Sequence, residues 1–264
     1  KMSETKIILI GKKPVLKNPI LVEGLPGIGY VGRNAVAYLI EELGAVKFAE
    51  LSSHHFPPVV LIDAKKNGKI VGLKNEFYYI KAPKGTSRDI VILVGDSQSI
   101  DSLGHYEIVE TVLDFAKDLK IKEIITTGGF ATGELVERAP NVFGAVADDK
   151  YAERFEKNGV KFKDTNIGQI IGASGLLISM GHERGMKGIC LMGETSGMLL
   201  SDPKATEAVL EAIVKYLGIK IDMTKIDKRV KEIEAVIKKI ESLHTKMAAG
   251  SKSGSGGDHL GYIG

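Results

Sequence analysis

The chain has 264 residues, of which 44% are hydrophobic and 26% charged, as in a globular protein with one large α/β domain or two small ones. It contains no apolar run long enough for a membrane span. The net charge of +3 resides in residues 220–264 and is too small and too mixed for a nucleic-acid-binding surface.

Apolar runs alternate with helical patterns through residues 1–218, which favours a single α/β core with a mixed sheet and flanking helices. Strands are predicted at Lys6–Ile10, Ile20–Glu23, Val46–Leu51, Val59–Asp63, Ile70–Leu73, Glu76–Ile80, Asp89–Val94, Glu123–Thr127 and Gly188–Met192. Helices are predicted at Tyr30–Leu43, Ser102–Leu119, Asp148–Asn158 and Lys204–Leu217. Asp101 and Ser201 or Asp202 are suitable N-caps, and Pro203 suits a first helical turn.

A hairpin is predicted between two of the short strands. Lys66-Asn67-Gly68-Lys69 separates them, and Asn-Gly is the preferred central pair of a two-residue type I′ turn. A hairpin joins antiparallel strands, so part of the sheet is expected to be antiparallel.

The turn after the second predicted strand carries three closely spaced glycines, Gly27, Gly29 and Gly32, in the form of a dinucleotide-binding fingerprint. Two interpretations are open. The glycines either approach a cofactor or simply allow a strand to turn tightly into a helix. A phosphate-binding P-loop is excluded, because Tyr30 and Val31 stand where that motif requires lysine and a hydroxyl residue.

Polar residues follow two further strands. Asp96 and Gln98 come after one buried strand, and Gly129 comes after the next, where residues at carboxyl ends often border a ligand crevice. With Gly27, Gly29 and Gly32 they form a candidate pocket; helix capping is the alternative. The spacing of Cys and His residues predicts no metal site, and no catalytic residue is assigned.

Two apolar segments are broken by glycines: residues 168–177 and residues 188–197. Glycine within a buried segment permits a positive φ or a close backbone approach, so these segments predict tight packing around a pocket or a subunit contact. The second contains Cys190, the only cysteine, which we interpret as a small buried hydrophobe. One cysteine excludes an internal disulfide and favours a cytoplasmic protein.

The C-terminal part divides into a helix over residues 219–247 and a flexible tail over residues 248–264. The helix carries apolar residues at spacings of three and four, which is a heptad seam. The seam positions are Ile226, Val230, Ile233, Ile237 and Ile240. Such a helix either packs on its own domain or contacts another subunit.

The tail is rich in Gly and Ser, as in a flexible linker, and ends in an apolar tip. Leu260, Tyr262 and Ile263 form this tip, which either binds a partner or is an unremarkable frayed end.

Taken in order, several motifs resemble the proteasome assembly chaperone family, in particular its archaeal homologues. These motifs are Glu23-Gly-Leu-Pro-Gly-Ile-Gly-Tyr-Val-Gly32, Ser53-His-His-Phe-Pro-Pro58, Gly95-Asp-Ser-Gln98, Gly128-Gly129, Gly168-Gln-Ile-Ile-Gly-Ala-Ser-Gly-Leu-Leu177 and Gly193-Glu-Thr-Ser-Gly197. The resemblance implies a core similar to that of nucleoside phosphorylases, without an established enzymatic activity. It also implies oligomerisation and binding to α subunits of the 20S proteasome.

In the family that this chain resembles, a C-terminal tail can end in a hydrophobic residue, a tyrosine and any last residue, and it enters pockets between α subunits. Here Tyr262 is third from the end, so the tyrosine is displaced by one position. The tail is expected to bind α subunits in this or another register, or to bind a related chaperone.

The leading hypothesis is a cytoplasmic, homo-oligomeric, non-enzymatic assembly chaperone or adaptor that needs no cofactor. A second hypothesis is an enzyme that acts on a nucleoside or nucleotide through the phosphorylase-like core. A third is a self-assembling scaffold without affinity for the proteasome.

Overall fold

The computed structural model describes residues 5–162, 168–228 and 230–232. The chain divides into two compact units, residues 1–222 and residues 223–264. In the second unit the described residues are helical at 224–228 and 230–232, so Ile226 and Val230 lie on a helix as predicted. The other seam positions, Ile233, Ile237 and Ile240, and the tail residues Leu260, Tyr262 and Ile263 lie outside the described residues.

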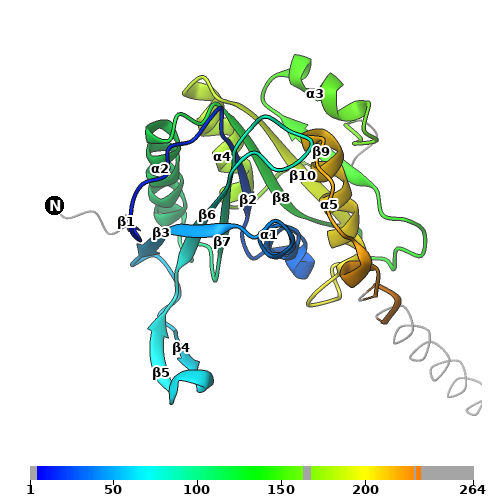
Figure 1. Ribbon diagram of the computed structural model, residues 1–264. Coiled ribbons are helices and arrows are strands. Elements are labelled where there is room, and N and C mark those ends of the chain that lie inside the picture. Colours follow the sequence, from blue (N-terminus) through cyan, green and yellow to red (C-terminus); the bar gives the residue numbers. More distant parts are fainter. Residues whose placement is uncertain (1–4, 163–167, 229, 233–264) are drawn as a thin grey trace, which may run out of the picture. The chain divides into compact units, whose positions relative to one another are not determined.

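An eight-stranded mixed sheet forms the centre of the first unit (Figure 1). Its spatial order is β1 (Thr5–Leu9), β3 (Val46–Ser53), β6 (Asn75–Ile80), β7 (Ile90–Gly95), β2 (Ile20–Gly24), β8 (Glu123–Ala131), β10 (Lys187–Thr195) and β9 (Val142–Val146). The four central strands β7, β2, β8 and β10 are parallel to one another. The strands on either side of them join in antiparallel pairs.

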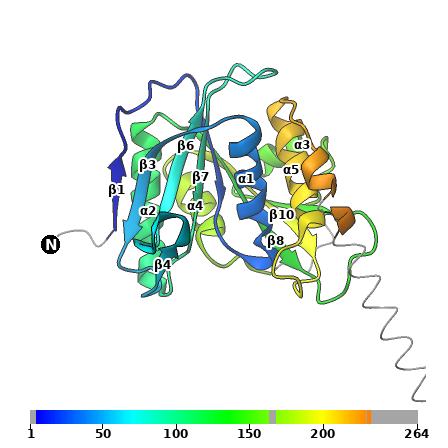
Figure 2. The same cartoon turned by 60° about the horizontal axis from the view of Figure 1, so that its bottom comes forward.

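Helices cover the sheet in two layers. The helices are α1 (Val31–Glu42), α2 (Ser102–Asp118), α3 (Asp149–Glu156), α4 (Ala173–Glu183) and α5 (Pro203–Leu217). Figure 2 shows α1 and α5 side by side on one face, with α2 and α4 on the other. Because both faces are covered, β2 and β7 are buried along their whole length. None of the described helices combines the length and apolar character needed to cross a bilayer.

Aromatic side chains fill the core between α2 and the antiparallel half of the sheet. Phe48 of β3 and Phe77 of β6 are fully buried there, and Phe115 of α2 contacts both. The ring centroids of Phe77 and Phe115 are 5.0 Å apart in an edge-to-face arrangement, which is a favourable aromatic geometry. This cluster holds α2 against the sheet.

Every strand and helix predicted within residues 1–218 is present, with ends that differ from the prediction by up to four residues. One α-helix and one strand are not among the predicted elements. Residues 173–183 form α4, which overlaps the glycine-broken apolar segment at residues 168–177. The helix is apolar almost all round and contains two glycines, so no amphipathic period marks it. The short edge strand β9 was missed because it is a brief apolar run interrupted by Gly144.

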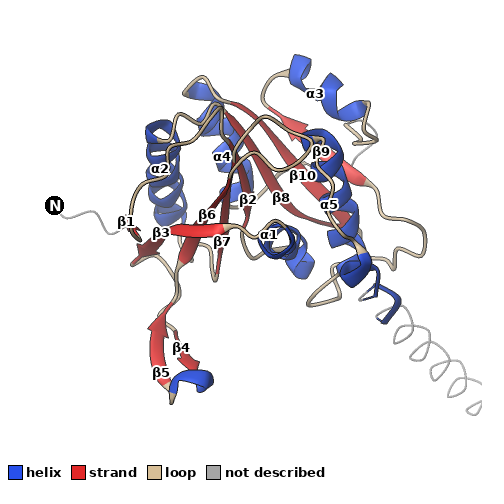
Figure 3. Ribbon diagram, in the orientation of Figure 1, coloured by secondary structure: helices blue, strands red, loops and turns tan. Residues whose placement is uncertain are grey.

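The predicted hairpin is confirmed, but its turn is longer than predicted. Strands β4 (Val60–Asp63) and β5 (Lys69–Gly72) form a separate two-stranded antiparallel sheet (Figure 3). Asp63 pairs with Lys69, so the loop contains residues 64–68 instead of two residues. Asn67 and Gly68 adopt the expected positive φ of 53° and 75°, but the 3₁₀ turn Ala64–Lys66 precedes them.

Candidate functional site

The residues of the predicted pocket lie at one edge of the sheet, where the parallel strands β2, β7 and β8 end. The 3₁₀ turn Ile28–Tyr30 follows β2 and leads into α1. Gly129 of β8 lies against this turn, since a Cβ atom on Gly129 would be 2.5 Å from the carbonyl oxygen of Ile28. Gln98, after β7, donates from Nε2 to the carbonyl oxygen of Pro26 at 2.8 Å. The predicted convergence of these segments is therefore present.

Gln98 ties three segments together through its side-chain amide. While Nε2 donates to Pro26, Oε1 accepts a hydrogen bond from the backbone N of Ala173 at 2.9 Å. That bond satisfies an unpaired N–H group at the start of α4, which is a capping role. Gly172 has a φ of +98°, and a Cβ atom there would lie 2.5 Å from Oε1 of Gln98. Asp96 instead accepts a hydrogen bond from the backbone N of Lys74.

The glycines of the fingerprint allow backbone packing. A Cβ atom on Gly32 would lie 2.3 Å from the carbonyl oxygen of Thr127 in β8, so the first turn of α1 touches that strand directly. Gly29 has a φ of +60°, and its carbonyl oxygen accepts a hydrogen bond from the backbone N of Asp202 at 2.9 Å. Gly27 is extended and has no atom within 4 Å of a Cβ position. These contacts support the interpretation as a tight strand-to-helix turn.

The last two residues of β10 make polar contacts at the same edge of the sheet. Thr195 Oγ1 donates to the Asp202 carboxylate at 2.6 Å. Asp202 also caps α5, which agrees with one of the two predicted N-caps. Glu194 accepts two hydrogen bonds from Arg138, at 2.6 and 2.7 Å, in the bidentate geometry typical of a strong pair. Arg138 holds the pKa of the Glu194 carboxyl below its usual range.

Glu23, at the end of β2, is a fully buried carboxyl group that sequence reasoning did not assign to the site. Its oxygens accept hydrogen bonds from the backbone N of Leu25 at 3.0 Å and from the Ser174 hydroxyl at 3.2 Å. Burial raises the pKa of this group to about 7. The visible signal was a carboxylate in an otherwise apolar strand, because such a group needs partners in the core.

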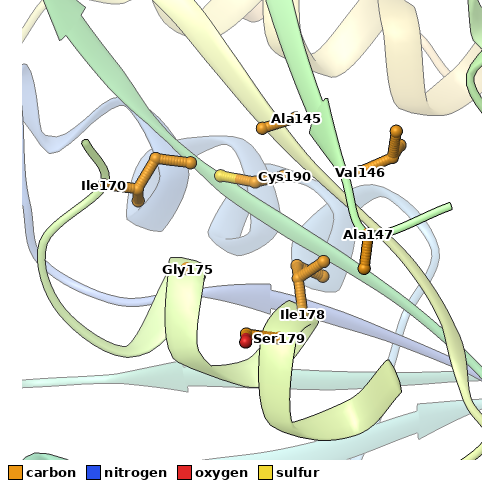
Figure 4. A pocket seen from close by; sticks show the side chains of 8 residues that line it. All are labelled: Ala145, Val146, Ala147, Ile170, Gly175, Ile178, Ser179 and Cys190. Atoms are coloured by element: carbon orange, nitrogen blue, oxygen red, sulfur yellow. The ribbon is translucent and has the colours of Figure 1, made fainter. Parts of the chain in front are cut away.

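An apolar hollow of about 250 Å³ lies beside this cluster, between α4 and the β9–β10 edge (Figure 4). Its lining residues are Ala145, Val146, Ala147, Ile170, Gly175, Ile178, Ser179 and Cys190. Cys190 is buried as predicted, and burial raises the pKa of its thiol to about 12. The neutral thiol is a poor nucleophile at neutral pH. None of the predicted pocket residues lines this hollow.

The histidine beside the base of the hairpin is part of a polar contact with α2. His55 Nδ1 lies 2.8 Å from an Asp101 carboxylate oxygen, and Nε2 lies 3.4 Å from Glu107. Asp101 raises the pKa of His55 and also caps α2, as predicted. Within the part of the chain that the structure describes, no group of three or more His, Cys, Asp or Glu side chains is placed to hold a metal ion.

Comparison with known proteins relates this arrangement to one family. The model of the PAC2 family matches residues 21–241. The chain belongs to the PAC2 family. The match extends from β2 through α5, and with the likeness to PbaB and PbaA the resemblance to proteasome assembly chaperones is confirmed.

Individual relatives align with nearly the whole chain. Uncharacterized protein MJ1210 of Methanocaldococcus jannaschii is 39% identical, over 94% of this chain and 93% of the relative. The crystal structure of Pyrococcus furiosus PbaB, an archaeal proteasome activator, has 44% identity and a TM-score of 0.84, covering 91% of this chain and 100% of PbaB. PbaA of the same organism, an archaeal homolog of proteasome-assembly chaperone, has 27% identity and a TM-score of 0.70, covering 94% and 95%.

Replacement of Glu23 by glutamine should stabilise this PAC2 core in a pH-dependent way. Folding favours the protonated carboxyl, so the native residue loses stability as the pH rises from about 4.5 to about 7. A shift of this size corresponds to about 3 kcal/mol. We expect Glu23→Gln to be the more stable protein at about pH 8, with the difference fading toward pH 5, in denaturant titrations.

Glu194→Gln is the matched control for this experiment. Its carboxyl has a lowered pKa because of Arg138, so this replacement should destabilise the fold near neutral pH, and less so in acid. A Glu23→Gln protein whose stability relative to the native chain is the same at both pH values would contradict the buried-carboxylate description.

Replacement of Gly32 by alanine should weaken the contact between α1 and β8. The added methyl group would overlap the Thr127 carbonyl oxygen, and overpacking of this kind costs about 1–3 kcal/mol. Gly27→Ala in the same motif meets no atom within 4 Å and should change the free energy of unfolding by less than about 0.5 kcal/mol. Equal losses in the two variants, measured by thermal denaturation, would show that close packing is not the role of Gly32.

Proposed function

We propose that this protein is a non-enzymatic assembly chaperone or adaptor that forms homo-oligomers and binds proteasome α subunits or a related chaperone. The observation that carries the proposal is the likeness to PbaB over nearly the full length of both chains. PbaB is described as a proteasome activator and PbaA as a homolog of proteasome-assembly chaperone, so both relatives point to the same machinery.

The contacts of the candidate site favour a structural role for its polar groups over a catalytic one. Gln98 uses both ends of its amide to hold neighbouring segments, and Glu23 is buried against Leu25 and Ser174. A catalytic group must instead reach a reacting atom. The polar groups at this edge of the sheet thus serve to fix one arrangement of the loops.

The C-terminal tail is proposed to contribute to partner binding. Residues 248–264 are a Gly/Ser-rich tether that carries Leu260, Tyr262 and Ile263 at its tip. Once another part of the protein has bound, a tether raises the effective concentration of its tip at the partner. An oligomer carries several such tips, which would multiply this effect. The similarity of the core to nucleoside phosphorylases and the cytoplasmic location remain part of the proposal.

Deletion of residues 248–264 should weaken binding to α subunits while leaving the core folded. Loss of one arm of a multivalent contact can lower the overall affinity on the order of 100-fold or more. Binding would be measured by light scattering of size-exclusion fractions and by calorimetric titration with α subunits of the same organism. Tyr262→Ala should reproduce much of the loss, and Ser253→Ala in the tether should not. Unchanged affinity after the deletion would remove the tail from the mechanism.

A thermal-shift series with nucleosides, nucleotides and phosphate separates this proposal from the enzymatic alternative. We expect no saturable change in the melting temperature, because ligand binding to the folded state would raise it. A saturable increase that Asp96→Ala abolishes would favour the nucleoside- or nucleotide-acting enzyme. A stable homo-oligomer that ignores α subunits and related chaperones would favour the scaffold.

A further inference from the structure

The β4–β5 hairpin exposes apolar side chains on both of its faces. The exposed fractions are 55% for Val60, 45% for Leu61, 71% for Ile62 and 66% for Ile70. Val60, Leu61 and Ile62 are consecutive in β4, and successive strand residues point to opposite faces. Both faces of the hairpin therefore carry exposed apolar side chains. A two-stranded hairpin alone is only marginally stable in water and has two open edges. Figure 1 shows this hairpin standing away from the main sheet.

The base of the hairpin is fixed to the start of α2. The backbone N of Ile100 donates to the carbonyl oxygen of His55 at 3.0 Å, and the His55 ring contacts Asp101. Gly104 lets the two segments approach, since a Cβ atom there would be 2.3 Å from that of His55. Phe56 is buried directly after this contact. The hairpin thus extends from an anchored base.

A surface of matching character lies along α2. Leu103 and Tyr106 are 80% and 52% exposed, and the acidic residues Glu110 and Asp114 follow them on exposed positions. Spacings of three and four place these four residues in one stripe of the helix. We call them the α2 stripe. It is apolar in its first half and acidic in its second, where Asp114 also accepts a hydrogen bond from Arg184.

The hairpin carries the complementary charge. At the turn end of the hairpin, Lys66 and Lys69 are exposed, and Lys66 Nζ lies 3.8 Å from the Asp63 carboxylate in a weak surface pair. An apolar stem with a basic end therefore corresponds to a stripe with an apolar half and an acidic half. Both surfaces occur once in every chain, so a second copy of the chain supplies the partner for each.

We propose that the β4–β5 hairpin of one molecule packs on the α2 stripe of a second copy of this chain. This assignment rests on the homo-oligomer of the proposed function and names the contact that builds it. The two surfaces are different, so the contact is head-to-tail and repeats from copy to copy until a ring closes. Burial of the apolar side chains drives the association, and the lysine–carboxylate pairs set its orientation.

Two single replacements test the contact from its two sides. Ile62→Asp removes the hairpin surface, and Leu103→Asp removes the stripe, each at an exposed position. Asp in the first turn of a helix is favourable, so Leu103→Asp should leave α2 intact. We expect each variant alone to elute as a monomer in size-exclusion light scattering. Val15→Asp, at an 87% exposed apolar residue outside both surfaces, is the control and should keep the native mass.

Mixing the two variants is the decisive measurement. The Leu103→Asp chain keeps an intact hairpin and the Ile62→Asp chain keeps an intact stripe, so the mixture should give particles of twice the monomer mass that neither variant gives alone. Variants that keep the native mass, or a mixture that remains monomeric, would overturn the proposal.

A charge exchange keeps the proposal testable if either variant fails to fold. Lys69→Glu and Glu110→Lys should each lower the oligomeric fraction, and the chain with both replacements should recover it. Loss without recovery, or no loss in either single variant, would overturn the proposal.

These results are separable from those on proteasome binding. If the native chain is a monomer that still binds α subunits, the contact and the homo-oligomer are wrong, while the proposed binding of α subunits stands. If oligomers form through the hairpin without any affinity for α subunits, the contact stands and the chaperone proposal fails. Oligomers that persist in both variants and dissociate only after deletion of residues 223–264 would assign self-association to the C-terminal seam.

Discussion

The first turn of α1 lies directly against the backbone of two parallel strands, and the rest of the molecule is arranged around this contact. A Cβ atom on Gly24 would be 2.3 Å from the carbonyl oxygen of Gly32, and one on Gly32 would be equally close to that of Thr127. No side chain separates β2, α1 and β8 at this point. The connecting turn must therefore be tight, which explains the positive φ of Gly29. The carbonyl oxygen of Gly29 accepts a hydrogen bond from the backbone N of Asp202, so the turn also positions the start of α5.

Around that contact, buried polar side chains join loops that belong to different strands. Gln98 connects the segments after β2 and β7 with the start of α4, and Glu23 connects β2 with Ser174 of α4. Glu23 serves this purpose at a cost in stability, since burial disfavours its charged form. We interpret the group as a device that specifies one arrangement of the loops, because an apolar residue would fill the space without fixing any partner.

Most strands and helices could be predicted along the chain, because the central strands are buried on both faces and the helices α1, α2 and α5 are amphipathic. The helix α4 could not be predicted, because its apolar residues show no helical periodicity. Its conformation depends on packing against α2, β8 and β10. The Asn67-Gly68 pair predicted the left-handed conformations of the hairpin turn. The loop length was not predictable, since the preceding 3₁₀ turn has no comparable signal.

The convergence of the segments around the candidate site was predictable, and their individual contacts less so. The carboxyl ends of parallel strands share one edge, so the glycine turn, Gln98 and Gly129 could be placed together from the sequence. The partners of Gln98 depend on the path of the chain at Gly172 and Ala173, 74 and 75 residues further on. A sequence pattern does not give that path. The buried carboxylate of Glu23 carried a visible signal, namely a charge inside an apolar strand.

Strands β3 and β6 of the main sheet continue along the chain into β4 and β5 of the hairpin, and the two parts of this ribbon expose different kinds of side chain. Strands β3 and β6 carry Lys47, Glu50 and Glu76 in a network of ion pairs that Lys74 completes, with side chains about a quarter exposed. Where this ribbon continues as β4 and β5, the strands expose Val, Leu and Ile, and the charged residues Asp63, Lys66 and Lys69 lie near the turn. The partly exposed positions on β3 and β6 thus carry paired charged side chains. The change to apolar residues begins where the chain leaves the sheet, which is the pattern of an interface and not of general hydrophobicity.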